Sequence, residues 1–76
     1  MNRNCAEAIV EALNMILSDL PLAKAVENEK FERLQQELHA SEWRTVIDEF
    51  KVVDGVAYGK ARLVGKDSPD AVAVYG

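Results

Sequence analysis

The sequence predicts an α+β fold in which an antiparallel hairpin of two helices packs on one face of a three-stranded antiparallel sheet. Within residues 4–39, apolar side chains recur at spacings of three and four, which is typical of amphipathic helices. Asp54 and Gly55 separate two runs of alternating residue types, the pattern of a β-hairpin. Residues 71–75, "AVAVY", alternate again as a strand does. The predicted order is therefore helix, helix, strand, strand, strand.

The length of the chain allows one domain. With 76 residues, of which 49% are hydrophobic and 29% are charged, it has the composition of a globular protein and too few residues for a second core. We expect a single domain over residues 1–76, with the helical hairpin at about 4–39 and the sheet at about 43–75. A core of this size supplies only about 3–5 kcal/mol of net stability, which favours a homodimer.

The first helix is expected to begin at Asn4, because Asn4 and Glu7 resemble a capping box. It ends before Pro21, which lacks an amide hydrogen and disfavours helical geometry in the preceding residue. Its apolar face consists of Ala6, Ile9, Val10, Leu13, Ile16, Leu17 and Leu20.

The second helix is expected to run from about Pro21 to about His39. Its short connection to the first helix favours an antiparallel pair, whose apolar faces pack together and leave some width for the sheet to cover. The apolar face of the second helix is less regular and consists of Leu22, Val26, Phe31, Leu34 and Leu38.

The register of the hairpin follows from its turn. If Asp54 and Gly55 are the central residues of a type I′ turn, Val53 pairs with Val56 and the other pairs follow by counting outward. The apolar face then pairs Val52 with Ala57, Phe50 with Gly59 and Val46 with Leu63, while the solvent face pairs Glu49 with Lys60 as an ion pair. This register predicts that Phe50 is buried over the bare backbone of Gly59.

Asp48 does not fit this register, because it falls on the apolar face opposite Ala61. It is either a buried, hydrogen-bonded carboxylate or a contact residue that only a partner reaches. Residues 41–50 also admit a second interpretation, a short third helix capped by Ser41. That helix would explain the spacing of three, one and three residues between Trp43, Val46, Ile47 and Phe50. Strand and helix both remain open here, and the β-branched residues favour the strand.

No catalytic, metal or cofactor site is predicted. The stretch 55–61, "GVAYGKA", resembles part of a phosphate-binding loop, but three residues rather than four separate its glycines and an alanine replaces the hydroxyl residue. Cys5 and His39 are the only residues of their types, so a single chain cannot build a zinc site from these types alone. We therefore expect that the protein is not an enzyme and binds no cofactor.

We predict a small acidic protein-binding module, a regulator or inhibitor of a larger protein, that acts through its second helix or an exposed sheet edge. Its size and its net charge of −4 are common among proteins of bacteriophages and mobile elements, the setting that we expect. Trp43 is either an interaction hot spot or a core residue. The candidate partner-binding residues are Trp43, Asp48, Tyr58, Lys60, Arg62 and Tyr75.

The alternative is a nucleic-acid-binding module that uses the hairpin at 44–65. It depends on the basic residues Arg44, Lys60, Arg62 and Lys66. The net charge of −4 opposes this alternative, because an acidic surface repels a phosphate backbone at long range.

The cellular setting is predicted from what the sequence lacks. The single cysteine, the absence of a leader pattern and the absence of an apolar run near the roughly 18 residues of a membrane span predict a cytoplasmic protein with no membrane contact. We expect the homodimer to form through the strand at 71–75, whose edge carries no Lys or Pro, or through the uncovered side of the helical hairpin.

Overall fold

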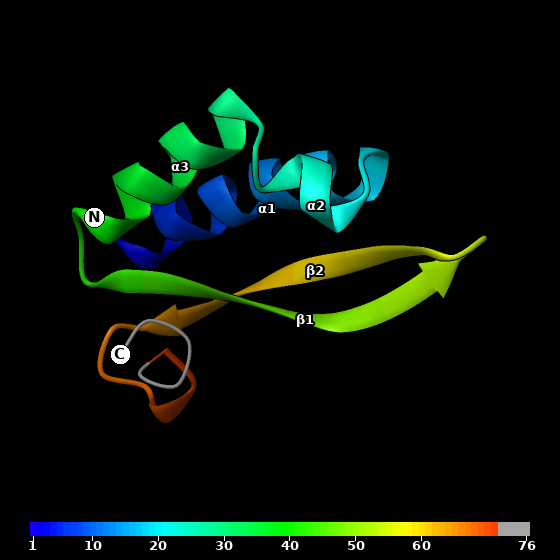
Figure 1. Ribbon diagram of the computed structural model, residues 1–76. Helices are drawn as coiled ribbons and strands as arrows, with labels where there is room; N and C mark the ends of the chain where they lie inside the picture. The colour runs from blue at the N-terminus through cyan, green and yellow to red at the C-terminus, as the bar shows by residue number, and fades with distance from the viewer. Residues whose placement is uncertain (72–76) are drawn as a thin grey trace.

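The computed structural model describes residues 1–71 and has an α+β fold, with helices packed on a two-stranded antiparallel sheet (Figure 1). The helices form a layer on one face of the sheet, and the chain after the second strand turns to the opposite face (Figure 1). The elements are α1 (Arg3–Asp19), α2 (Leu22–Ala25), α3 (Glu29–His39), β1 (Trp43–Val53) and β2 (Val56–Gly65).

The cap of the first helix, α1, lies two residues earlier than the capping box predicts. The side chain of Asn2, not Asn4, accepts a hydrogen bond of 2.8 Å from the amide of Cys5 and caps the helix. The predicted apolar face is confirmed, because four of its members are buried and Ile9, Ile16 and Leu20 pack against them. The four buried residues are Ala6, Val10, Leu13 and Leu17.

The predicted second helix is broken in two. The Oδ1 atom of Asn28 accepts hydrogen bonds from the amides of Lys30 and Phe31, at 2.9 and 3.2 Å, and this cap starts α3 as a separate helix. Val26 lies between α2 and α3 and is exposed, so its predicted place on the apolar face is wrong. Phe31 and Leu38 of α3 are buried as expected.

The stretch that the sequence left open between strand and helix belongs to a strand, β1. The pairs next to the turn, from Val53 with Val56 to Lys51 with Tyr58, have the predicted register. Beyond them the register shifts, because Glu49 and Phe50 together oppose Gly59 in a β-bulge. All later predicted pairs are therefore wrong by one residue.

The bulge explains why Asp48 did not fit. A shift of one residue moves each side chain of β1 to the other face of the sheet, so Ile47 now opposes Ala61 and Asp48 opposes Lys60. Ile47 and Ala61 pack in the core beneath the helices. Val46, predicted to lie on the core face, instead forms a second small cluster with Val64 and Ala71.

The predicted third strand is not part of the described sheet. Residues 69–71 are helical, and the remainder of the predicted strand at 71–75 lies outside the described residues. Within residues 1–71 the sheet therefore consists of β1 and β2 alone.

Candidate functional site

The hairpin has two differently covered halves. Its base, residues 43–48 and 60–65, has α1 and α3 on one face and the segment after β2 on the other (Figure 1). Its distal half, residues 49–59, is called the arm below; α1 lies beside the start of the arm, and the tip extends past the helices (Figure 1). The change in cover coincides with the bulge at Glu49 and Phe50.

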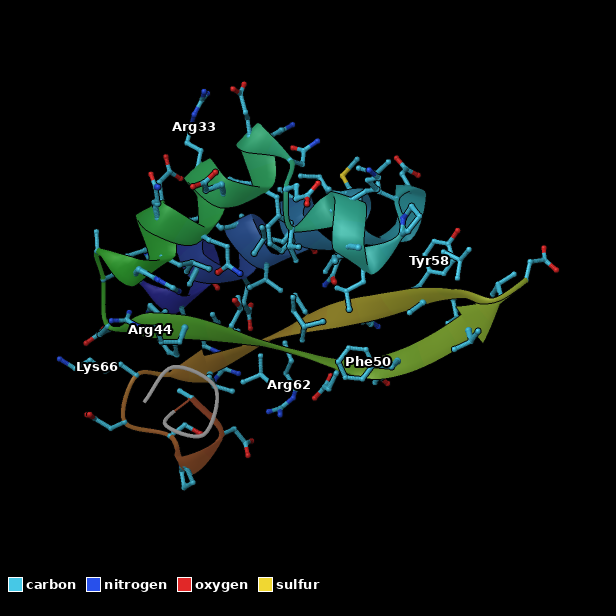
Figure 2. All side chains as sticks on the ribbon, viewed as in Figure 1. Arg33, Arg44, Phe50, Tyr58, Arg62 and Lys66 are labelled. Atoms are coloured by element: carbon cyan, nitrogen blue, oxygen red, sulfur yellow. The ribbon has the colours of Figure 1, made fainter. Side chains whose placement is uncertain are left out.

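The arm exposes large apolar side chains. Phe50 is 62% exposed and Val52 is 69% exposed, so the prediction that Phe50 is buried is wrong. Val53 and Val56, on either side of the turn, are 48% and 36% exposed. Phe50 projects from one strand of the arm and Tyr58 from the other (Figure 2). A group of exposed apolar residues on a small protein is the usual mark of an interaction surface.

The apolar surface of the arm continues the core face of the sheet. Val52 opposes Ala57, and Ala57 lies on the same side of β2 as the buried Ala61, four residues along the strand. The helices cover this face at Ala61 and leave it open at Val52. The arm is thus the uncovered end of a continuous apolar face.

The backbone of Glu49, at the start of the arm, is strained. Its φ angle is 51°, in the left-handed region that residues other than glycine rarely adopt. Asp54 and Gly55 also have positive φ, at 53° and 78°, as the two-residue turn at the tip requires. The bulge at Glu49 bends β1 at the start of the arm, because bulges increase the local twist of the strand that carries them.

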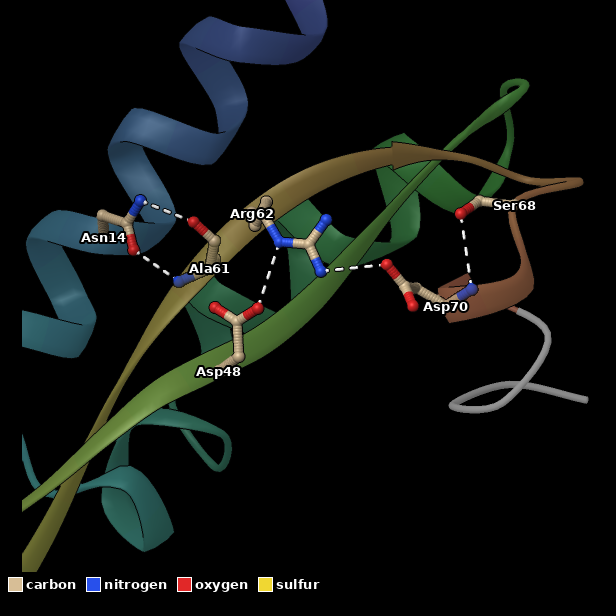
Figure 3. A network of polar contacts seen from close by, with 6 residues as sticks. All are labelled: Asn14, Asp48, Ala61, Arg62, Ser68 and Asp70. Carbon is tan, nitrogen blue, oxygen red and sulfur yellow. Dashed lines mark hydrogen bonds and ion pairs between the residues drawn. The ribbon is translucent and has the colours of Figure 1, made fainter.

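The outer edge of β2 is held by α1. The side-chain amide of Asn14 donates to the carbonyl of Ala61 at 3.1 Å and accepts from the amide of Ala61 at 2.7 Å (Figure 3). Both backbone groups of Ala61 therefore point away from β1. Since alternate residues of a paired strand point their backbone groups the same way, Gly59 and Ala57 also direct theirs outward.

A hollow lies between α1 and the arm. It encloses about 380 Å³. Its walls are formed by Asn14, Leu17 and Ser18 of α1 and by Glu49, Lys51, Tyr58, Gly59 and Lys60 of the hairpin. Asn14 occupies the edge of β2 at Ala61, and the hollow begins next to it, toward the tip of the hairpin. The outward-facing backbone of Gly59 therefore borders the hollow.

Trp43 stands at the first position of β1, at the base of the hairpin. It is half-buried and packs against the core, and its Nε1 donates to the carbonyl of Met1 at 3.2 Å. Trp43 therefore joins the start of the chain to the first residue of β1.

Asp48 and Arg62 pair with each other on the face away from the helices. Nε of Arg62 contacts Asp48 at 3.0 Å and its NH2 group contacts Asp70 at 3.1 Å (Figure 3). These hydrogen bonds, that of Asp48 first, raise the pKa of Arg62 above its ordinary value. The predicted pairing of Glu49 with Lys60 is not among the ion pairs within residues 1–71, although both side chains line the hollow.

Tyr58 and Lys60 are a second pair of predicted site residues that the structure brings together. Tyr58 is half-buried and Lys60 is exposed, and both line the hollow beside the arm. Tyr75 lies outside the described residues. The site residues that the sequence analysis missed are Asn14 and the apolar residues of the arm, and the misfit of Asp48 was the one signal of the bulge that exposes them.

Two of the basic residues of the hairpin, Arg44 and Arg62, contact other groups of the protein. NH1 of Arg44 donates to the carbonyls of Leu38, Ser41 and Trp43, at 3.4, 2.9 and 2.7 Å. A cation at the carboxyl end of α3 is favoured by the helix dipole. Of the four basic residues on which the nucleic-acid alternative depends, Arg44 and Arg62 therefore already contact groups of the protein.

Other kinds of site find no support in the described part of the chain. Among residues 1–71, no three His, Cys, Asp or Glu side chains are grouped so that they could hold a metal ion, and no helix has the length and apolar character to cross a membrane. Comparison with protein families, curated proteins and solved structures gave no match.

Proposed function

We propose that the protein is a non-enzymatic protein-binding module that regulates or inhibits a larger protein by inserting its hairpin arm into an apolar groove of that protein. The exposure of Phe50 and Val52 at the end of an otherwise covered apolar face carries this proposal. Burial of such side chains supplies about 25 cal/mol per Å² of apolar surface removed from water, so even a narrow arm can anchor a complex.

The shape of the arm supports insertion rather than flat contact. Its two strands are linked by a two-residue turn, and Val53 and Val56 place apolar side chains immediately before and after it. Aromatic and branched side chains on a pre-formed hairpin lose little conformational freedom on binding, which favours affinity.

A pair of variants matched in exposure tests the proposal. Met15 on α1 is 70% exposed and Val52 on the arm is 69% exposed, so Val52→Asp and Met15→Asp place the same charge at equally accessible apolar sites. We expect Val52→Asp to abolish capture of the partner from extract of the native host, and Met15→Asp to leave capture unchanged. Capture that survives Val52→Asp contradicts the proposal.

The same capture distinguishes the nucleic-acid alternative. Treatment with nuclease before capture leaves a protein partner in place and removes one that is bridged by nucleic acid. The expected result is a partner band that persists after nuclease. A band that disappears assigns the binding to nucleic acid and overturns the protein-binding proposal.

A further inference from the structure

The open edge of β2 has room for one short strand. Asn14 occupies the backbone of Ala61 as a peptide group of a neighbouring strand would, and α1 prevents further pairing on that side. Toward the tip, Ala57 and Gly59 direct their backbone groups outward. An added strand must therefore pair within residues 55–59.

One arrangement of a second copy satisfies this limit. In a two-fold antiparallel pairing centred on Ala57, Ala57 opposes its own copy, and residue 55 of each chain opposes residue 59 of the other. The adjacent pairs are Val56 with Tyr58 of the second copy, a β-branched side chain against an aromatic one. The result is a continuous four-stranded sheet with the two β2 strands at its centre.

The hollow accepts the tip of the second copy in this register. Asp54 of one chain then opposes Lys60 of the other, and Lys60 lines the hollow with Asn14 and Ser18. The tip consists of Asp54 and Gly55, the smallest part of the arm, so it enters without a bulky side chain. Each chain supplies one tip and one hollow, as two-fold symmetry requires.

The charge of the arm also suits a second copy. The whole chain carries a net charge of −4, which repels another copy at long range. The arm contains two acidic side chains, Glu49 and Asp54, and one basic one, Lys51, and the adjoining Lys60 of the base balances its remaining negative charge. A basic partner would be drawn to the acidic remainder of the chain, whereas two copies of the neutral segment 49–60 can meet without net repulsion.

We propose that the free protein is a homodimer in which the β2 strands of two arms pair antiparallel about Ala57, each tip lying in the hollow of the other chain. This inference rests on the proposed function, because it makes the dimer a resting state that covers the arm until a larger protein displaces the second copy. Partner binding and dimerisation then exclude each other, and the fraction of chains with a free arm falls as the concentration of the protein rises.

The first test is the mass of the protein in solution. Sedimentation equilibrium at about 100 µM should give twice the chain mass of 8.4 kDa, with dissociation on dilution. A monomer at this concentration overturns the dimer. Monomer that still captures its partner through Val52 leaves the proposed function standing, so the two proposals fail separately.

A matched pair of proline variants locates the contact. Ala57 and Val52 oppose each other in the hairpin and direct their amides to the two outer edges, so neither amide serves the ladder between β1 and β2. Ala57→Pro should weaken the dimer by more than about tenfold, and Val52→Pro should leave it intact. The reverse result places the contact on β1 and overturns the proposal. Circular dichroism of both variants reports whether each is folded.

A charge exchange tests the register itself. Asp54→Lys and Lys60→Glu should each be monomeric alone, because each places like charges opposite one another twice in the dimer. Mixed together, the two variants should form a heterodimer in which both pairs are again of opposite charge. Failure of the mixture to associate, with both chains folded, overturns the pairing of Asp54 with Lys60.

Discussion

The base and the arm of the hairpin share two strands and one apolar face, yet they differ in what covers that face. At the base, Ala61 is buried beneath the helices, and Val46 on the other side is buried with Val64 and Ala71. On the arm, Phe50 and Val52 are mainly exposed. The difference teaches that alternation within a strand shows which residues share a face, but not whether another element covers it.

The same comparison separates stability from interaction. The base contributes to the folded state of a single chain, whereas Phe50 and Val52 of the arm keep most of their solvent contact when this chain folds. Substitutions in the two regions should therefore have different consequences, and the four predictions below are ordered by the size of the expected change.

The largest change is expected on truncation of the core. Leu13 is fully buried, and Leu13→Ala should lower the free energy of unfolding by about 2–5 kcal/mol through lost burial and the cavity that remains. Phe50→Ala should lower it by less than about 0.5 kcal/mol, although phenylalanine is the larger side chain. Urea denaturation of the two variants under conditions that keep the chain monomeric measures both. A loss of similar size at Phe50 would mean that the arm is covered within one chain.

Removal of the clamp between α1 and β2 is expected to have the next largest effect. Asn14→Ala leaves the amide and the carbonyl of Ala61 without their side-chain partners and should cost about 1–3 kcal/mol. Hydrogen exchange of the Ala61 amide should accelerate in this variant. Asn14→Asp is the control for the two bonds, since it keeps an acceptor for the amide and loses the donor to the carbonyl.

The glycine at the bulge should tolerate substitution less well than the glycine at the end of β2. A Cβ at Gly59 would stand 2.7 Å from Cγ2 of Ile47, whereas a Cβ at Gly65 would meet nothing within 4 Å. Gly59→Ala should therefore lower stability by about 1 kcal/mol, after the gain from a less flexible unfolded chain is subtracted from the overpacking cost. Thermal unfolding should show Gly65→Ala unchanged. Equal melting temperatures for the two variants would contradict the close packing of Ile47 on Gly59.

The smallest change concerns pH at the junction of α3 and the base. Burial, followed by the charge of Arg44, lowers the pKa of His39 below its ordinary value of 6.5. The unfolded chain therefore binds the proton more tightly, and the contribution of neutral His39 to stability is complete above the ordinary value and is lost as pH falls through the lowered one. Wild-type protein should lose slightly more stability than His39→Gln between neutral and mildly acidic pH. If the stability of the two proteins depended on pH in the same way, the lowered pKa of His39 would be contradicted.

The sequence predicted those parts of the fold that depend on local chemistry. The apolar face of α1 and the turn at Asp54 and Gly55 were predicted correctly because helical spacing and positive φ leave few alternatives. The break before α3 was missed, although Asn28 is a good helix cap, because the apolar spacing continued across it. The predicted third strand at 71–75 was placed from alternation alone; its first residue, Ala71, is helical, and its other residues lie outside the described part of the chain.

The candidate site was harder to predict, because it is defined by what the helices fail to reach. Phe50 was expected in the core because it is aromatic and alternates with Val52, a pattern that exposed and buried strands share. The hydrogen bonds of Asn14 to Ala61 join residues far apart in the sequence, and no local sequence pattern predicts them. Asp48 alone carried a signal, since a carboxylate on an apolar face indicates that the assumed register is wrong.

Glu49 can be regarded as the one residue of β1 that the ladder does not need. Without it, Phe50 would follow Asp48 directly, and both would keep their present places opposite Gly59 and Lys60. A chain lacking Glu49 would therefore retain its pairs, its core and the other side chains of the arm, but the strand would straighten and the arm would leave the helices in another direction. The direction of the arm determines which partner surface can receive it. Insertion or deletion of one residue at position 49 can therefore change this direction without changing the fold.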